Sequence, residues 1–381
     1  MKFSIRRQPL LASIQEVNHA ISPRTAVVPI LTGMKLTLDE EVLTLTGSNS
    51  DITIESTIPK QVEEENIISI EETGSIVLPI PHFSDIIRKL PGDLVEIEVQ
   101  ENYKTIIKAE QSVFELHGQS SEEYPHIIIN KSEPHFSVEA SKLKQLIRQT
   151  AFAVSTMETR PILTGVHMTI HGNDVRFTAT DTHRLAQSQV PIEKYTDAID
   201  EMSIVVPGQS LHELNKIIDD QDGKISLSIM QNQVLFFTER KTFISRLLSG
   251  TYPDTERLIP TNLNTTLHIP TNEFIRTIDR AALLASAEQN NVVRFEAKGD
   301  GTIEISSNSP EIGRVNEQMT ILSHEGDEVN ISFSSRYLLD TLRTIGSEEI
   351  MISFTGPMNP FVIKTPASDK ILHLILPVRT H

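Results

Sequence analysis

An internal repeat constrains the fold of this chain more than any other feature of its sequence. The segment VPILTGMKLTL at Val28–Leu38 resembles RPILTGVHMTI at Arg160–Ile170. SIVLPIPHFSDIIRKL at Ser75–Leu90 likewise resembles SIVVPGQSLHELNKII at Ser203–Ile218, and a weaker third copy is VNISFSSRYLLDTLRTI at Val329–Ile345. Several matches in the same order and at similar spacing indicate three copies of a unit of about 125 residues.

Each unit shows the same predicted order of elements. A short strand opens it, and a helix follows with apolar residues three or four positions apart, as at Leu10, Ile14 and Val17. Alternating strands come next, and a second helix leads into the closing strands. The pattern predicts an α+β fold in which every unit has two helices and antiparallel sheets.

The length and composition agree with three folded domains. A chain of 381 residues holds two to four domains at about 100–200 residues each. Hydrophobic residues make up 38% and charged residues 22%, which is ordinary for a folded protein and argues against long disorder. We place the domain limits in polar, proline-rich stretches after each Tyr-Pro pair: 1–128, 129–263 and 264–381.

The composition also excludes several classes of protein. The chain has no cysteine, which excludes a disulfide framework, thiolate metal ligands and a thiol nucleophile. No apolar run approaches the roughly 18 residues of a membrane span. The N-terminus MKFSIRRQPLLASIQ lacks the long apolar core of a secretory signal. We therefore expect a cytoplasmic protein that has no membrane contact.

Charge is distributed unevenly between the predicted helices and the rest of the chain. The net charge is −17, which on average repels nucleic acid. The helix-like spans nevertheless hold ten Lys or Arg against six Asp or Glu, so they are net positive. Either this is ordinary variation on helix surfaces, or the helices line a surface that tolerates phosphates. The spans are 9–20, 81–90, 141–154, 209–218, 271–284 and 334–345.

The sequence contains no recognisable catalytic or cofactor motif. Phosphate-loop, dinucleotide, zincin and nucleophile-elbow patterns are all absent, and the 13 His are scattered. We expect no cofactor and no metal. One stretch, ATDTHRLA at Ala179–Ala186, crowds Asp181, His183 and Arg184 together. His183 could be a general base oriented by Asp181, or Asp181 could cap a polar turn, or the turn could display Arg184 and Leu185 beside an apolar groove.

The C-terminal stretch ILHLILPVRTH is very apolar for the end of a chain. Alternation buries one face of a strand, but Leu374, Leu376 and Val378 must also face something, and Pro377 limits strand pairing. Such an apolar strip indicates a partner, and a plain packed terminal strand is the alternative.

Taken together, these motifs resemble the bacterial DNA sliding clamps, the beta subunits of DNA polymerase III. The resemblance covers the whole chain and includes the threefold repeat, ATDTHRLA, GTYPDTERLIP and the ending LPVRTH. Family members often have Gly where Thr182 stands, and this C-terminus runs slightly past the usual ending.

The resemblance implies a fold and a function without catalysis. Two subunits join head to tail into a ring of six similar domains, with helices inside and sheets outside. The ring encircles duplex DNA without reading its sequence and tethers the replicative polymerase, which confers processivity. A separate clamp loader would close it on DNA, and other proteins would bind through the same short linear motif.

The resemblance also implies where partner peptides insert, in an apolar pocket between the second and third domains. The residues that match the family's pocket are Leu163, Thr180, Thr182, His183, Arg184, Leu185, Pro253, Arg257, Leu258, Pro360, Leu374, Leu376, Pro377, Val378 and Arg379.

Two further sets of residues follow from the same matching. Phe114 of the first domain would meet Leu283 and Leu284 of the third domain at the subunit join, although ordinary core packing is the alternative. The DNA-facing set is Arg24, Lys142, Lys144, Arg148, Arg276 and Arg280.

Two other hypotheses remain open at this point. A pseudo-symmetric hydrolase would use Asp181 and His183, and replacing His183 would abolish turnover. A monomeric three-domain interaction scaffold would form no ring and would have no topological hold on circular DNA.

Overall fold

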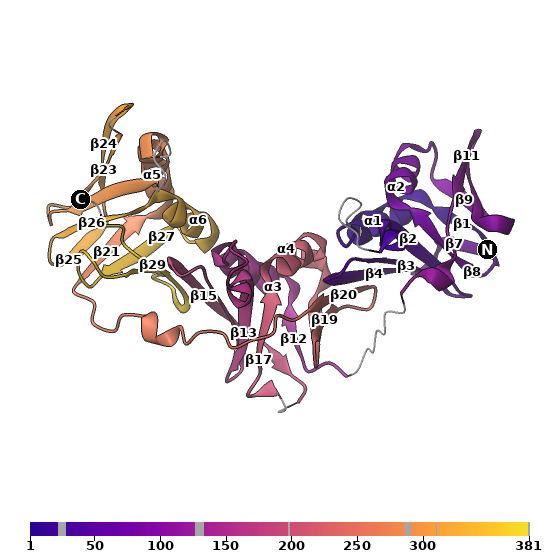
Figure 1. The fold of residues 1–381 in the computed structure, drawn as a ribbon, viewed down its shortest axis with the longest axis horizontal. Coiled ribbons are helices and arrows are strands. Elements are labelled where there is room, and N and C mark those ends of the chain that lie inside the picture. The colour runs from indigo at the N-terminus through magenta and orange to yellow at the C-terminus, as the bar shows by residue number, and fades with distance from the viewer. Residues whose placement is uncertain (22–27, 126–132, 197–198, 286–290, 310, 380–381) are drawn as a thin grey trace. The chain divides into compact units, whose positions relative to one another are not determined.

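The structure is a computed structural model that describes the chain except for residues 22–27, 126–132, 197–198, 286–290, 310 and 380–381 (Figure 1). Arg24 and the predicted limit between residues 128 and 129 lie outside the described residues. Among the helices of the described part, none is both long and apolar enough to cross a bilayer.

The described residues contain six α-helices, two in each domain, which confirms the predicted fold class. They are α1 (Arg7–Asn18), α2 (Ile80–Lys89), α3 (Ala140–Thr150), α4 (Gly208–Ile217), α5 (Thr271–Ala285) and α6 (Ser335–Ile345). The predicted span 141–154 is longer than α3. The α-helix ends at Thr150, whose φ of −128° departs from helical geometry, and a 3-10 turn at Ala151–Ala153 follows.

Helix α6 illustrates why these segments are helical. Leu338, Leu342 and Ile345 are spaced three or four residues apart, and all three are buried. The helix stops at Gly346, which adopts a left-handed φ of +68° that glycine accepts without steric cost. The apolar face of α6 packs on the sheet strands of the C-terminal domain and on α5.

Four larger antiparallel sheets carry the helices. The first nine-stranded sheet has the order β16 (Glu193–Lys194), β12 (Phe136–Glu139), β18 (Lys224–Met230), β19 (Gln233–Phe237), β20 (Lys241–Arg246), β4 (Ile52–Pro59), β3 (Val42–Ser48), β2 (Gly33–Leu38) and β8 (Gly74–Pro79). The second nine-stranded sheet has the order β17 (Ser203–Pro207), β13 (Gly165–His171), β14 (Asp174–Thr180), β15 (Arg184–Pro191), β29 (Ser368–Ile375), β28 (Phe361–Thr365), β27 (Glu349–Phe354), β21 (Thr265–Pro270) and β25 (Ser323–Gly326).

The other two sheets each belong to a single domain. The five-stranded sheet of the first domain has the order β11 (Ser112–His117), β10 (Lys104–Ala109), β9 (Leu94–Val99), β1 (Lys2–Arg6) and β7 (Ile68–Glu72). The four-stranded sheet of the third domain has the order β24 (Gly313–Thr320), β23 (Thr302–Ser309), β22 (Val292–Ala297) and β26 (Val329–Ser334). A small hairpin pairs β5 (Gln61–Val62) with β6 (Glu65–Asn66).

The chain divides into two compact units. The first unit comprises residues 1–141, 193–197 and 212–247, and the second comprises 142–192, 198–211 and 248–381. The middle domain contributes to both because each of its sheets continues into a neighbouring domain. In the first unit β4 pairs with β20, and in the second unit β15 pairs with β29. Sheet continuity therefore links consecutive domains within each unit.

Candidate functional site

The ATDTHRLA stretch forms a tightly capped turn between β14 and β15. One carboxylate oxygen of Asp181 accepts hydrogen bonds from the backbone N–H of His183, at 2.9 Å, and of Arg184, at 3.0 Å. The hydroxyl of Thr180 donates to the carbonyl of Arg184 at 2.6 Å. Within the described residues no hydrogen bond joins the Asp181 carboxylate to the His183 ring. Asp181 therefore caps a polar turn, and the catalytic pair imagined from the sequence is not assembled.

Arg184 points into the protein. Its side chain is 8% exposed and forms ion pairs with Asp181 at 3.0 Å and with Asp340 of α6 at 2.7 Å. It also donates to the carbonyl of Phe152 at 2.8 Å, and its guanidinium lies over the rings of Phe152 and Tyr337. The expectation that the turn displays Arg184 and Leu185 is wrong, because both side chains are buried. A buried guanidinium needs such partners.

His183 remains exposed next to Arg184 and stacks on Tyr337, with ring centroids 6.2 Å apart and planes 14° apart. Burial raises the pKa of Tyr337, and the Asp181 carboxylate raises it further. The sequence analysis missed Tyr337, since nothing in the helical pattern of α6 shows that this half-buried position faces a turn of another domain.

An apolar cluster lies beside the turn. It contains three members of the expected pocket, Leu185, Leu374 and the half-buried Leu376, together with Val362, Leu372 and Ile259, which were not expected there. Leu185 pairs directly with Leu374 across β15 and β29, and the backbone N–H of Leu376 donates to the carbonyl of His183 at 2.9 Å. The C-terminal segment is thus fastened to the turn.

The linker that follows the middle domain is anchored by Tyr252. Its hydroxyl accepts from the backbone N–H of Thr180 at 3.1 Å, its ring stacks on His167, and Leu163 packs in the same small cluster. Burial raises the pKa of Tyr252, so the phenol stays protonated. After this anchor Pro253 is exposed.

The rest of the predicted set is exposed or half-buried. Arg257 is 87% exposed and pairs with Asp254, and Leu258 is 52% exposed. Thr182 is exposed and has a left-handed φ of +79°. The remaining members are Pro360, Pro377 and Val378, which are half-buried, and Arg379, which is exposed.

The predicted DNA-facing residues differ in their surroundings. Lys142 and Lys144 are half-buried on α3, whereas Arg148 and Arg276 are exposed and have no ion pair within the part of the chain that the structure describes. Arg280 is exposed but is paired with Glu317 of β24 at 2.7 Å.

The residues predicted for the subunit join lie in different units. Phe114 is 41% exposed on β11 in the first unit. On α5 in the second unit, Leu283 is 72% exposed and Leu284 is half-buried. For Phe114 and Leu283 this exposure argues against the alternative of core packing.

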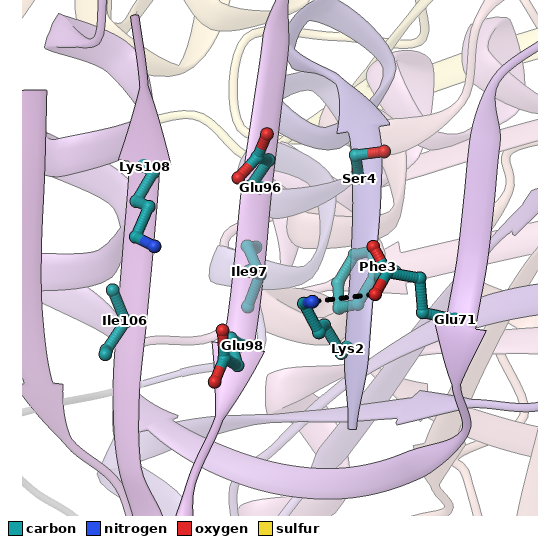
Figure 2. A pocket seen from close by; sticks show the side chains of 9 residues that line it. All are labelled: Lys2, Phe3, Ser4, Glu71, Glu96, Ile97, Glu98, Ile106 and Lys108. Carbon is teal, nitrogen blue, oxygen red and sulfur yellow. Dashed lines mark ion pairs between the residues drawn. The ribbon is translucent and has the colours of Figure 1, made fainter. Parts of the chain in front are cut away.

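A separate hollow lies on the exposed face of the five-stranded sheet and contains none of the predicted site residues. Figure 2 shows Lys2, Glu96 and Glu98 projecting from adjacent strands, with an ion pair of 2.7 Å from Lys2 to Glu71. The hydrogen bond that Lys2 donates to Glu71 raises the pKa of Lys2. These exposed cross-strand pairs stabilise the sheet weakly. No group of three His, Asp or Glu in the described residues is arranged to hold a metal ion.

Comparison with known proteins gives one consistent result over the whole chain. Family models described as the N-terminal, central and C-terminal domains of the DNA polymerase III beta subunit match residues 1–128, 137–254 and 256–379. The beta sliding clamp of Bacillus subtilis (strain 168) is 48% identical over 381 residues, which is 100% of both chains, and that of Staphylococcus aureus (strain N315) is 44% identical over the same full length.

Solved structures agree with these relatives. The DNA polymerase sliding clamp from Bacillus subtilis superposes with a TM-score of 0.95, at 48% identity and full coverage of both chains. A clamp from Pseudomonas aeruginosa, solved bound to griselimycin, has a TM-score of 0.91 at 27% identity, again over the full length of both. The chain therefore belongs to the bacterial DNA sliding clamps, the beta subunits of DNA polymerase III, and is a non-catalytic processivity factor for the polymerase.

Proposed function

We propose that two copies of the chain close head to tail into a ring around duplex DNA. We propose further that the turn, the linker and the C-terminal segment of the second unit bind the short linear motifs of partner proteins. The replicative polymerase, a clamp loader and other motif-bearing proteins would share this site. The domain limits 1–128, 129–263 and 264–381 and a cytoplasmic location are part of the proposal.

The main support for the ring is that two free strand edges of the chain are equivalent to the edges that already pair inside it. Inside the chain, strand β4 of the first domain pairs with β20 of the second, and β15 of the second pairs with β29 of the third. The strand equivalent to β4 and β15 in the third domain is β24, and the strand equivalent to β20 and β29 in the first domain is β11. Both β24 and β11 are edge strands.

Pairing these two edges between copies would join a four-stranded and a five-stranded sheet into a third nine-stranded sheet. This matches the two nine-stranded sheets inside the chain. A head-to-tail contact that repeats twice with closure leaves neither β24 nor β11 as an unpaired edge. Val113 and Phe114 on β11 and Leu283 on α5 are exposed apolar side chains that such a join would cover.

The DNA contact in this proposal is electrostatic and independent of sequence. Arg148 and Arg276, which are exposed, are its best-supported members, and Lys142, Lys144 and Arg24 complete the basic group. Phosphate contacts of this kind carry no base information, and a body of net charge −17 prevents tight binding elsewhere. The duplex can then slide through the ring.

The partner site in this proposal combines an apolar floor with a polar edge. The floor is the cluster around Leu185, Leu374 and Leu376, and burial of such side chains contributes about 25 cal/mol per Å². The edge is the exposed ring of His183 with Thr182, and the exposed linker residues Arg257 and Leu258 flank it. The other proposed members are Leu163, Thr180, Arg184, Pro253, Pro360, Pro377, Val378 and Arg379.

The ring is tested by native mass and by retention on DNA. We expect a species near twice 42.7 kDa that, once loaded, stays on nicked circular DNA and escapes from linear ends. The double variant Leu283→Asp, Leu284→Asp should give folded monomers that are lost from both DNAs. A wild-type monomer at micromolar concentration, or equal loss from circles and linear DNA, would instead leave a three-domain scaffold.

The partner site is tested by calorimetry with a synthetic peptide that covers the clamp-binding segment of the organism's replicative polymerase. Griselimycin, the ligand in the Pseudomonas clamp structure, serves as a second probe. We expect saturable binding of the peptide and its displacement by griselimycin. No binding to the intact dimer would refute the site.

A further inference from the structure

One helix position recurs in all three domains, and in the first two it faces the join to the next domain. It is the tenth residue of the first helix of each domain, and each of the three residues bonds to the fourth strand of its own domain. Ser56 donates to Glu16 at 2.8 Å, Ser188 donates to Gln149 at 2.8 Å, and Arg280 donates to Glu317 at 2.7 Å.

The strand positions are equivalent as well. Ser56 lies opposite Leu45 in the sheet register, Ser188 lies opposite Phe177, and Glu317 lies opposite Ile305. The three opposing residues are buried core side chains. Glu16, Gln149 and Arg280 therefore occupy one structural position, although the repeat in the sequence does not show it.

At each join inside the chain, hydrogen bonds connect the residue at this position, directly or through one other side chain, to the last residue of the second helix of the following domain. At the first join, Lys241 pairs with Glu16 at 3.1 Å and donates to the carbonyl of Ile217, the last residue of α4, at 3.2 Å. At the second join, Gln149 itself donates to the carbonyl of Ile345, the last residue of α6, at 3.3 Å. The last carbonyls of a helix lack partners and carry partial negative charge, so both donors satisfy them.

At the third position Arg280 has no such carbonyl among the described residues of its own chain. It uses Nε and one terminal nitrogen for Glu317, and its other terminal nitrogen makes no hydrogen bond within the described residues. The hydrogen bond that Arg280 donates to Glu317 raises the pKa of Arg280, so the guanidinium stays charged. Glu317 lies on β24, the free edge of the third domain.

We propose that Arg280 is a residue of the subunit join, where it donates to the C-terminal carbonyl of helix α2 in the second copy, at Lys89. The equivalence of α2, α4 and α6 assigns this acceptor, because Lys89, Ile217 and Ile345 are the last residues of these helices. The inference rests on the proposed ring and reassigns Arg280 from the DNA-facing set to the join. Arg280 acts with Glu317 as a neutral pair, as Glu16 and Lys241 do at the first join.

The test measures dimer dissociation by sedimentation of the full-length protein. Arg280→Ala should weaken each join about tenfold, as expected for a lost charged hydrogen bond, and a ring has two joins. The double variant Arg280→Gln, Glu317→Ser copies the Gln149 and Ser188 pair of the second join, and it should restore the dimer. Arg276→Ala, one turn away on the same helix, should leave dimerisation unchanged and weaken only the salt-sensitive affinity for DNA.

Cross-linking gives a second measurement. The chain has no cysteine, so Arg280→Cys with Lys89→Cys provides one reactive pair at each of the two joins. We expect a short bifunctional maleimide to give covalent dimers of the double variant. Neither single variant should give covalent dimers.

The two proposals fail in different ways. A monomeric wild type refutes the ring itself. A wild-type dimer that Arg280→Ala does not weaken, including one in which this variant loses only affinity for DNA, overturns the assignment of Arg280 alone.

Discussion

Two turns of the molecule share one backbone design and differ in what surrounds them. In the first domain Asn49 accepts from the backbone N–H of Asp51 and Ile52, at 2.8 and 2.9 Å. In the middle domain Asp181 accepts in the same way from the two residues at the equivalent positions. The carbonyl of Asp51 then accepts from the N–H of Arg246 at 2.9 Å, as that of His183 accepts from Leu376.

The two turns differ in the side chains that they carry at equivalent positions. Ile52 stands in the first domain where Arg184 stands in the middle domain, Thr53 where Leu185 stands, and Arg246 where Leu376 stands. Only the middle-domain turn therefore has both an apolar floor and a buried cation. The Asx turn therefore belongs to the repeated fold, whereas the candidate site belongs to one join.

The largest expected effect is on stability at Arg184. Arg184→Met leaves the carboxylates of Asp181 and Asp340 without their counter-charge, which should cost about 3 kcal/mol of unfolding free energy. Ile52→Met, at the equivalent position, should cost less than about 1.5 kcal/mol. Urea denaturation followed by circular dichroism compares the two, and equal losses would show that Arg184 has no special structural role.

The next effect concerns partner binding. Leu376→Asp should weaken binding of the polymerase peptide about hundredfold, because it places a charge against the apolar floor. Arg246→Asp, at the equivalent backbone position of the first join, should leave the affinity unchanged. Leu376 is chosen because it is half-buried, whereas Leu185 is fully buried and its replacement would also disturb folding. Calorimetry measures the peptide affinity of both variant dimers. An unchanged affinity in Leu376→Asp would place the site elsewhere.

A third prediction concerns pH and His373. Burial lowers the pKa of His373 to about 3, and neither ring nitrogen has a hydrogen-bond partner among the described residues. The unfolded chain binds this proton below its ordinary pKa of 6.5, so stability falls as pH drops from 6.5 toward 3, by at most about 1.4 kcal/mol per pH unit.

Phe243 occupies the equivalent position at the first join, opposite Ile54 as His373 is opposite Ala186. His373→Phe should therefore remove this part of the acid sensitivity and leave stability above pH 7 the same or higher. Unfolding free energies of the wild type and of His373→Phe, measured from pH 8 to pH 4, test this prediction. A slope identical to that of the wild type would mean that His373 is not buried neutral in solution.

The smallest effect is expected at the tip of each turn. Thr182 adopts a left-handed φ of +79°, and Ser50, at the equivalent position, is not among the described residues with positive φ. Thr182→Gly should raise the thermal midpoint, with a gain of at most about 1 kcal/mol. Ser50→Gly should lose about 0.5 kcal/mol through added freedom of the unfolded chain. A change in stability of the same sign in both variants would show that Thr182 and Ser50 do not differ in backbone strain.

Much of this protein follows from the sequence by itself. The threefold repeat and all six helices are visible because periodic apolar residues report local geometry. The cap formed by Asp181 is also local, since its backbone partners lie two and three residues away.

The role of Arg184 depends on contacts that the sequence does not show. Its partner Asp340 lies 156 residues away in the sequence, on a helix of another domain, and Tyr337 comes from the same helix. Local spacing cannot show which way a side chain turns at a join. Packing decides it, because a guanidinium beside an apolar cluster is stable only where carboxylates, a carbonyl and aromatic rings converge on it.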